Sequence, residues 1–346
     1  MSQPKVRFAV IGQGFFAQSA ILPAFRQVKN AELAALVSSD PTKLDELAKR
    51  YRVEETVRYE DFDLLLKRGS IDAVYIALPN SLHAEYACRA AAAGVHVLCE
   101  KPMAPSVDDC RKMMHCCDRA NVKLMVGYRL HFEAANLEAI EIARSGKLGT
   151  VRAFTSTLTA QVRPGNIRLQ ADKGGGPLFA LGTHAINAAR SVFHDDPTEV
   201  FAFSARMPGD PRFAEVNEQV SLVLRFPDER LANILVSFGA SECSKYEIVG
   251  TEGRLLVDPA YDFDSALKHD LVLGAKHQTR TFSKRDQIAP EIAYFADCIL
   301  NDEEPEPSGE EGLVDVRVVE GAFESIRTGR TVQLAPSTKT KRPTAA

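Results

Sequence analysis

The chain opens on a glycine turn that joins an apolar strand to a helix. Residues 6–11 read VRFAVI, and residues 12–17 follow directly as Gly-Gln-Gly-Phe-Phe-Ala. This is the G-x-G-x-x-A form of the dinucleotide fingerprint, in which the first glycine allows a tight turn and the second lets the backbone approach a pyrophosphate. The start of the next helix then offers N–H groups to the phosphates. The segment predicts a nucleotide-binding turn formed by Gly12, Gly14, Phe15 and Phe16.

The end of the second predicted strand bears on the choice of cofactor. Residues 32–37 read ELAALV, and Ser38 follows where a carboxylate would hold the 2′-hydroxyl of an adenine ribose. Ser38, Ser39 and Lys43 tolerate a 2′-phosphate better than an aspartate would, which favours NADP. Asp40 lies two residues further on and keeps NAD open as the alternative. The cluster is also typical of a helix N-cap, with Lys43 as a solvated helix residue.

The composition fits a folded enzyme of about two domains, the number that 346 residues suggest. The net charge of −4 gives no reason to expect nucleic acid or an anionic membrane as a partner. No apolar run reaches the roughly 18 residues of a membrane span. The first strand begins almost at the N-terminus, which leaves no room for a signal peptide and predicts a cytoplasmic protein.

The seven cysteines are odd in number and lack C-x-x-C spacing, so we expect all of them to be thiols in the cytoplasm. His115, Cys116 and Cys117 are adjacent on a predicted helix, where neighbouring side chains point in different directions. They therefore do not converge on one metal ion. His269, Asp270 and His277 show no ligand-like arrangement either, and no metal site is predicted.

The first part of the chain alternates strands and helices. Apolar runs predict six strands, at residues 6–11, 32–37, 56–59, 72–78, 95–99 and 123–127. Pro23 predicts that the helix after the glycine turn kinks or restarts. Crossover helices between such strands give a doubly wound parallel sheet, whose ligands bind beyond the carboxyl ends of the strands. Residues 1–127 are thus predicted to form a Rossmann domain.

The pattern changes in residues 128–346. After a helix at 133–145, alternation of apolar and polar residues predicts an antiparallel sheet. Its strands are expected at 150–162, 199–207, 219–226, 230–238, 246–250 and 254–258, with short pieces at 271–273 and 279–282. Helices are expected at 177–192, 290–300 and 313–328.

Three motifs beside the fingerprint carry a resemblance: ALPNSLHAE at 77–85, CEKPMA at 99–104 and GYRLH at 127–131. Together they resemble the Gfo/Idh/MocA oxidoreductases, and within them the glucose–fructose oxidoreductase group. The resemblance implies a Rossmann domain followed by a domain on an open, largely antiparallel sheet. It also implies a nicotinamide cofactor between the domains and a sugar, polyol or related carbonyl substrate. The second sheet would form the contact of a homodimer or homotetramer.

Lys101 is the first catalytic candidate. Hydride transfer between a nicotinamide and an alcohol or ketone requires a proton to leave or reach the oxygen. Lys101 follows a strand and can hydrogen-bond that oxygen and stabilise its charge, and the resemblance implies this role for it. Glu100 would orient or tune the lysine, with a surface ion pair as the alternative, and a cis peptide before Pro102 would fix the turn.

His184 is the second catalytic candidate. It lies on the helix predicted at 177–192, after the glycines at 174–176, and the family's catalytic histidine or tyrosine falls at this position. A histidine, with an ordinary pKa of about 6.5, suits proton exchange near neutrality. Most dehydrogenases that the chain resembles carry an aspartate one turn earlier, where this chain has Ala180. Activity then rests on Lys101 and His184 alone, on another acid, or on a different substrate.

Further contacts are expected at the strand ends. Cofactor contacts are predicted for Leu78, Pro79, Asn80, His83, Glu100, Lys101 and Arg129. Substrate contacts are predicted for Lys101, Arg129, Arg168, Thr183 and His184, with His131 and Arg163 as secondary candidates. Surface or interdomain pairing explains the arginines equally well, and Asn80-Ser81 also fits an N-cap of the next helix.

The sequence therefore predicts an NADP-dependent oxidoreductase that acts on a sugar, polyol or related carbonyl compound, with a small molecule as its partner. Two alternatives remain open. One is a cofactor-binding regulator or scaffold that has lost catalysis, which Ala180 favours. The other is a redox-cycling NAD-dependent glycosidase, which would use the same nicotinamide site.

Overall fold

The computed structural model describes residues 4–336 of the chain, and these residues fold into two compact units. The first unit holds the described residues up to Ala104, together with Asp108–Phe132 and Asp286–Gly312. The second holds Pro105–Val107, Glu133–Arg285 and the described residues from Leu313 onward. The sequence placed one boundary at residue 127. That boundary stays a prediction, and in the structure the first unit also takes in a late segment of the chain.

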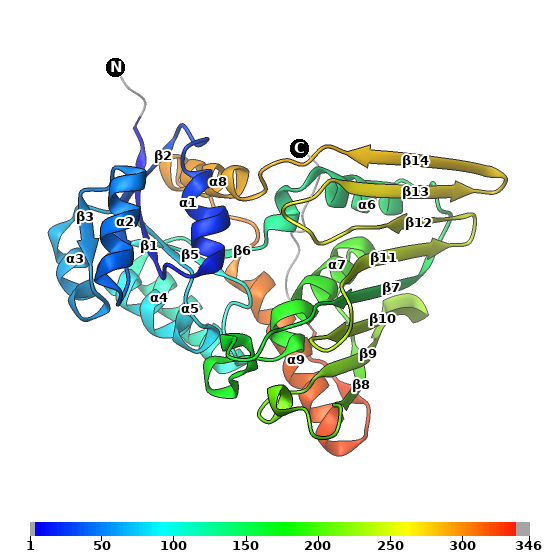
Figure 1. Ribbon diagram of the computed structural model, residues 1–346. Helices are drawn as coiled ribbons and strands as arrows, with labels where there is room; N and C mark the ends of the chain where they lie inside the picture. Colours follow the sequence, from blue (N-terminus) through cyan, green and yellow to red (C-terminus); the bar gives the residue numbers. More distant parts are fainter. Residues whose placement is uncertain (1–3, 337–346) are drawn as a thin grey trace. The chain divides into compact units, whose positions relative to one another are not determined.

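The first unit is built on a parallel sheet of six strands in the order β3-β2-β1-β4-β5-β6 (Figure 1). The strands are β1 (Val6–Ile11), β2 (Ala31–Val37), β3 (Glu55–Val57), β4 (Ala73–Ile76), β5 (His96–Glu100) and β6 (Leu124–Gly127). The chain winds outward in both directions from the neighbouring strands β1 and β4. This is the predicted doubly wound sheet, and the switch between its halves lies at the carboxyl ends of β1 and β4.

Helices connect the strands of this sheet: α2 (Pro41–Tyr51), α3 (Phe62–Arg68), α4 (His83–Ala92) and α5 (Val107–Ala120). The late helix α8 (Ile288–Asn301) packs on β1 and β2. After the glycine turn, a π-helical turn (η1, Ala17–Ile21) precedes the short α1 (Leu22–Ala24). Pro23 lacks an N–H and cannot make a regular helical bond, so the helix restarts there as the sequence predicted.

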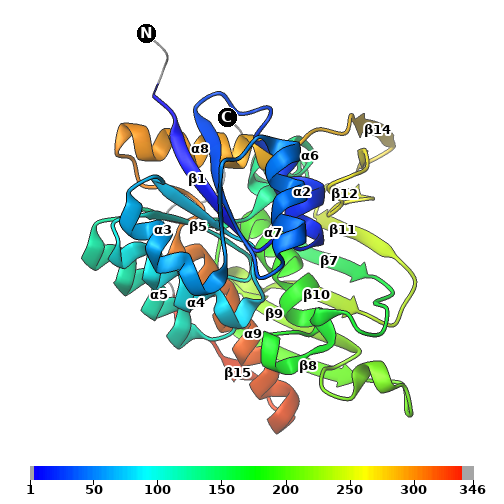
Figure 2. The same cartoon turned by 60° about the vertical axis from the view of Figure 1, so that its left-hand side comes forward.

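The second unit is built on nine strands in the order β14-β13-β12-β11-β7-β10-β9-β8-β15 (Figure 2). They are β7 (Val151–Thr159), β8 (Glu199–Ala205), β9 (Gln219–Phe226), β10 (Arg230–Ser237), β11 (Cys243–Gly250), β12 (Gly253–Val257), β13 (Leu267–Leu273), β14 (Lys276–Phe282) and β15 (Val332–Gln333). Its pairs are antiparallel except β7 with β10. The predicted, largely antiparallel sheet is confirmed.

One face of this second sheet is covered by helices. α6 (Ala134–Arg144) packs on β13, and α7 (Thr183–Phe193) packs on β7 and β10. Along β9, Val220, Leu222, Leu224 and Phe226 are buried while the residues between them are not. This period of two is what a sheet with one covered face produces. The closing helix α9 (Gly309–Thr328) begins in the first unit and continues in the second.

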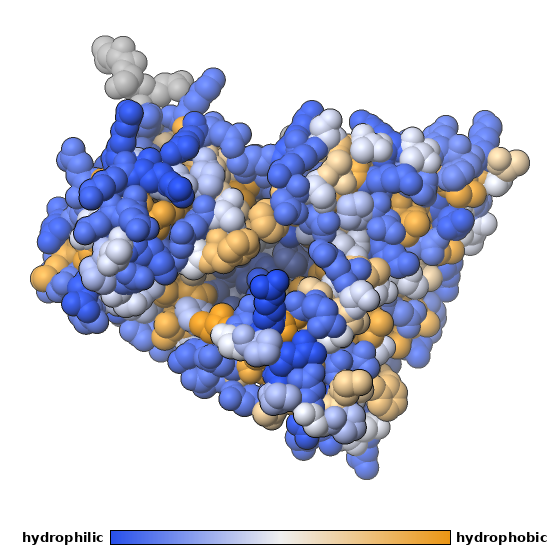
Figure 3. All heavy atoms as spheres, in the orientation of Figure 1, coloured by the Kyte–Doolittle hydropathy of each residue, from blue (hydrophilic) through white to orange (hydrophobic). Residues whose placement is uncertain are grey.

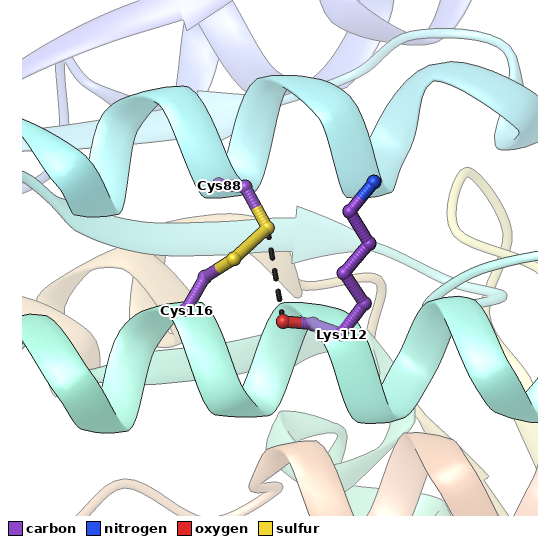
Figure 4. Close-up of a disulfide and its surroundings, with 3 residues drawn as sticks. All are labelled: Cys88, Lys112 and Cys116. Atoms are coloured by element: carbon purple, nitrogen blue, oxygen red, sulfur yellow. Dashed lines mark hydrogen bonds between the residues drawn. A yellow bond between two sulfur atoms is a disulfide. The ribbon is translucent and has the colours of Figure 1, made fainter.

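The cysteines correct one prediction. Cys88 of α4 and Cys116 of α5 form a disulfide, and Sγ of Cys88 lies 3.7 Å from the carbonyl oxygen of Lys112 (Figure 4). The expectation that all seven cysteines are thiols is therefore wrong for this pair. It holds for Cys99, Cys110, Cys117, Cys243 and Cys298. The pair was missed because its members are separated by 28 positions and only the packing of α4 against α5 joins them.

Within residues 4–336, no helix has both the length and the apolar character needed to cross a bilayer. The face seen in Figure 3 carries mostly hydrophilic side chains, with small hydrophobic patches between them.

Candidate active site

The glycine turn has the geometry that the fingerprint requires. Gly12 has a φ of +94°, and a Cβ on it would lie 2.4 Å from the carbonyl oxygen of Ala77, directly after β4. Only glycine fits both this backbone and this contact. A Cβ on Gly14 would meet no heavy atom within 4 Å, so the backbone there faces open space. Phe15 beside it is 81% exposed. The turn can thus receive a pyrophosphate at the switch point of the sheet.

The loop after β2 orders the residues that bear on NADP. Ser38 is buried, and its hydroxyl accepts a 3.3 Å hydrogen bond from the N–H of Asp40. Asp40 caps α2 by accepting from the N–H of Lys43 at 3.0 Å, and its carboxylate lies 3.7 Å from Nζ of Lys43. The N-cap alternative is therefore confirmed for Asp40. Lys43 would have to exchange Asp40 for a 2′-phosphate when NADP binds.

His83 joins two loops at the carboxyl edge of this sheet. Its ring is fully buried, with Nε2 3.0 Å from the carbonyl oxygen of Leu78 and Nδ1 3.0 Å from that of Pro102. Burial has the largest effect on its pKa and lowers it, whereas the backbone carbonyls that its ring contacts favour the charged form. His83 thus ties the loop that holds Leu78 and Pro79 to the loop after Lys101. Leu82, the N-cap residue of α4, makes no side-chain capping bond, and a capping role of Asn80-Ser81 stays a prediction.

Lys101 lies directly after β5, and the peptide bond to Pro102 is cis, as expected. The backbone N–H of Lys101 donates to Oε2 of Glu100 at 3.2 Å. Oε1 of Glu100 lies 2.8 Å from the hydroxyl of Tyr75 on β4. Glu100 is therefore held by the turn that carries Lys101 and is not an exposed ion pair.

Three more side chains extend this polar cluster. The hydroxyl of Tyr75 also lies 2.9 Å from Oε1 of Glu291 on α8. Arg129, which follows β6, is buried and donates to the side-chain oxygen of Gln287. Its charge lowers the pKa of both carboxyls, although burial has the larger effect and raises them. We call Tyr75, Glu100, Lys101, Arg129, Gln287 and Glu291 the lysine cluster.

Sequence reasoning missed Tyr75, Gln287 and Glu291. Tyr75 sits in an apolar strand where a tyrosine looks like core, and the other two begin a helix that the sequence assigned to the second domain. A glutamate in the buried stripe of a predicted helix was the one available signal, because such a charge rarely goes unpaired.

His184 belongs to the second unit, where it is 7% exposed at the start of α7. Its ring lies 6.4 Å from the ring of Tyr261, whose hydroxyl is 2.7 Å from that of Ser156. The hydroxyl of Thr183 donates to the carbonyl of Phe179 at 2.9 Å, a bond within its own helix. The hydroxyl proton of Thr183 is therefore already used in this bond. Thr183 is also fully buried.

The turn before His184 is apolar. Ala180 belongs to a π-helical turn, η7 (Leu178–Gly182), and packs against the buried side chains of Val162, Leu169, Phe213 and Phe238. An aspartate at 180 would place a carboxylate against these groups. An alanine at this position therefore suits the apolar side chains that surround it.

The glycines before η7 serve a backbone contact. The N–H groups of Gly175 and Gly176 donate to the carbonyls of Gln170 and Arg168, at 3.0 and 2.8 Å. A Cβ on Gly175 would lie 2.5 Å from the carbonyl oxygen of Arg168. The glycines thus pack against the backbone of Arg168. The side chains of Arg163 and Arg168 are exposed.

Three of the other histidines have separate partners. His131 stacks on Tyr128, with ring centroids 5.4 Å apart. His269 is buried with Nε2 2.9 Å from the carbonyl of Ala135, whereas exposed His277 lies 3.2 Å from Asp270. Successive strand residues face opposite sides, so His269 and Asp270 do not converge.

The fold and the turn define the class first: the first unit is a Rossmann domain with a glycine turn at its switch point. Residues 6–128 match the model of the oxidoreductase family with an NAD-binding Rossmann fold, and residues 136–256 match the GFO/IDH/MocA C-terminal domain. The chain belongs to the Gfo/Idh/MocA family of NAD(P)-dependent oxidoreductases, as the sequence motifs indicated.

Relatives cover nearly the whole chain. It is 33% identical to D-xylose 1-dehydrogenase [NADP(+)] of Haloarcula marismortui over 95% of this chain and 93% of that protein. The crystal structure of aldose-aldose oxidoreductase from Caulobacter crescentus with glycerol matches with a TM-score of 0.91 at 37% identity, covering 95% and 100% of the two chains. KijD10, a 3-ketoreductase from Actinomadura kijaniata solved with NADP and TDP-benzene, matches with a TM-score of 0.85 at 26% identity, covering 93% and 98%.

Proposed function

We propose that the protein is an NADP-dependent oxidoreductase that transfers hydride between the nicotinamide and a sugar, polyol or related carbonyl compound. The observation that carries this proposal is the lysine cluster, which holds Lys101 at the same sheet edge as the glycine turn of Gly12 and Gly14. A bound nicotinamide supplies or accepts the hydride. The names of the relatives, a xylose dehydrogenase and an aldose-aldose oxidoreductase, support a sugar substrate.

Lys101 would act as the general acid or base at the reacting oxygen. Its ammonium group can donate to the carbonyl oxygen of a ketone or aldehyde and so stabilise the negative charge that develops there on reduction. In the oxidation direction the amine form takes the hydroxyl proton. Glu100 favours the charged lysine and fixes the turn through the Lys101 N–H. A role of His184 at the same oxygen stays a prediction.

Two observations support NADP over NAD. Ser38, not a carboxylate, directly follows β2, and its hydroxyl accepts the N–H of Asp40. The xylose dehydrogenase relative is named for NADP, and KijD10 was solved with it. A 2′-phosphate would take Lys43 from Asp40, because a dianionic phosphate attracts the ammonium more strongly than one carboxylate does.

The decisive experiment is an assay of purified protein against a panel of aldoses, polyols and ketoses with each nicotinamide, together with mass spectrometry of any nucleotide released on denaturation. We expect NADP-linked turnover of at least one sugar. Tight NADP binding without turnover of any of them would overturn this function.

That outcome would support the second candidate, a cofactor-binding regulator of the same family. The specific observation in its favour is Ala180, packed in an apolar cluster one turn before His184. In that case NADP would still bind at the glycine turn, but no substrate would be consumed.

We further propose that the second unit forms a homo-oligomer through the uncovered face of its sheet. Phe203, Val223 and Leu231 are 66%, 36% and 39% exposed, and the strand pairing places all three on the same face of β8, β9 and β10. Exposed apolar side chains gathered on one face favour a protein partner. Phe203→Ser should shift the mass measured by light scattering toward the monomer, and a wild-type monomer would contradict the proposal.

A further inference from the structure

One phenol group lies between two carboxyl groups in the lysine cluster. The hydroxyl oxygen of Tyr75 is 2.8 Å from Oε1 of Glu100 and 2.9 Å from Oε1 of Glu291. Both distances are those of good hydrogen bonds. Tyr75 and Glu291 are fully buried, so water does not make these contacts in their place.

Counting protons shows that one carboxyl is an acid. A tyrosine hydroxyl carries one hydrogen and can donate to one of the two carboxyl oxygens only. The second contact needs a hydrogen on the carboxyl, since otherwise two oxygens with lone pairs would face each other in a buried site. Hence Glu100 and Glu291 are not both ionised while this geometry holds.

The surroundings identify which of the two keeps its proton. Oε2 of Glu291 is buried and has no hydrogen-bond partner among residues 4–336. An ionised carboxylate with an unpaired oxygen in such a site is costly. Glu100 instead accepts the backbone N–H of Lys101, and the positive charge of Lys101 lowers its pKa against the effect of burial. The charge therefore belongs on Glu100 and the proton on Glu291.

The charged and titratable groups around Glu291 agree with this assignment. Tyr75 faces it from β4, Glu100 from β5, and Arg129 from the turn after β6. Burial and the negative charge of Glu100 raise the pKa of Glu291 well above its ordinary value, and Arg129 opposes them without cancelling them.

We propose that Glu291 is a positioning residue that remains a neutral carboxylic acid at neutral pH and donates its proton to Tyr75, which donates in turn to Glu100. The chain from Glu291 to Tyr75 to Glu100 gives the carboxylate beside Lys101 a fixed position and a single negative charge. The protonation is independent of any activity, whereas the effect on catalysis rests on the proposed function of Lys101.

The first test uses stability, so it needs no substrate. Glu291 binds a proton in the folded state that it loses in the unfolded state above its ordinary pKa, so wild-type stability falls as pH rises. Between pH 5 and 8, the unfolding constant of the wild type should increase relative to Glu291→Gln by up to about tenfold per pH unit. The exposed Glu46→Gln serves as the matched control and should show a flat ratio. A flat ratio for Glu291→Gln would overturn the proposal.

An infrared measurement on the wild type covers the case in which the variant does not fold. The carbonyl band of a protonated carboxyl should persist at pH 7 and shift when the protein is labelled with ¹³C-glutamate. Absence of a label-sensitive acid band would equally overturn the assignment.

A catalytic comparison then tests the positioning role. Glu291→Gln keeps a donor for Tyr75 through its amide, whereas Glu291→Leu does not. We expect Glu291→Gln to exceed Glu291→Leu by about tenfold in kcat with similar KM, and Tyr75→Phe to displace the pH profile of kcat. Equal kcat and unchanged profiles would refute the positioning role. Lack of wild-type turnover would count against the proposed function alone, because the stability and infrared results do not depend on it.

Discussion

The two candidate catalytic residues lie in contrasting surroundings. Lys101 in the first unit is held by a buried set of charged and hydrogen-bonded groups drawn from β4, β5, the turn after β6 and α8. His184 in the second unit follows a turn that packs Ala180 on an apolar cluster. The contrast teaches that the departure from the family pattern is local to the second unit and leaves the lysine cluster intact.

The largest expected effect tests this contrast by removing each residue. Lys101→Met should lower kcat/KM by about 10²–10⁴-fold, the range for loss of a general acid or base. His184→Phe should cost less, about tenfold, because the turn before it carries Ala180 in place of a carboxylate that would orient the imidazole. Steady-state kinetics give both values, and NADPH titration of Lys101→Met should show retained binding. A greater loss for His184→Phe would reverse the comparison.

The second prediction concerns the stability that the disulfide gives to the first unit. The disulfide of Cys88 and Cys116 lies in the first unit, where it closes a loop with a separation of 28 residues. Removing it with Cys88→Ser should reduce the free energy of unfolding by about 3–4 kcal/mol on the chain-entropy account. Chemical denaturation with and without reductant measures this. Cys243→Ser in the second unit is the control and should change little; equal losses would refute the distinction.

This bond also bears on the cellular location. The expectation of seven thiols followed from the predicted cytoplasmic location, and disulfides persist mainly in oxidising compartments. The location stays a prediction, and alkylation of thiols in intact cells would show whether Cys88 and Cys116 are paired there.

The third effect examines the apolar turn. Ala180→Asp would supply the carboxylate that the family resemblance implies one turn before His184. In the structure Ala180 is partly buried and packs against an apolar cluster, where a carboxylate would lose hydration. We expect a loss of about 1–3 kcal/mol in stability and no gain in turnover. Ala180→Asn is the control, because asparagine has nearly the size of aspartate without its charge. A clear rise in polyol oxidation by Ala180→Asp would contradict this prediction.

The smallest effect concerns the cofactor in the first unit. Ser38→Asp places a negative charge near the expected 2′-phosphate, so it should weaken NADPH binding by about tenfold or about 1.4 kcal/mol and favour NADH. Fluorescence titration of both nucleotides checks the order. Ser39→Asp, one residue further, is the matched comparison. Equal wild-type affinities for NADPH and NADH would remove the case for NADP.

The sequence determined the elements that local pattern controls. Alternation of apolar runs and helices predicted the parallel sheet, and the fingerprint placed Gly12 at its switch point, because a positive φ and a close backbone contact demand glycine. Period-two burial along β9 likewise followed from the sequence. Lys101 was found because its motif is contiguous.

Only the tertiary structure decided which distant residues meet. Tyr75 and Glu291 are 216 positions apart and share a proton position only because α8 returns to the first sheet. Cys88 and Cys116 pair because two helices pack together. The apolar surroundings of Ala180 likewise became visible only in the packed structure. Local propensity reaches a few residues along the chain, whereas burial and pairing energies depend on packing, which one-dimensional pattern does not contain.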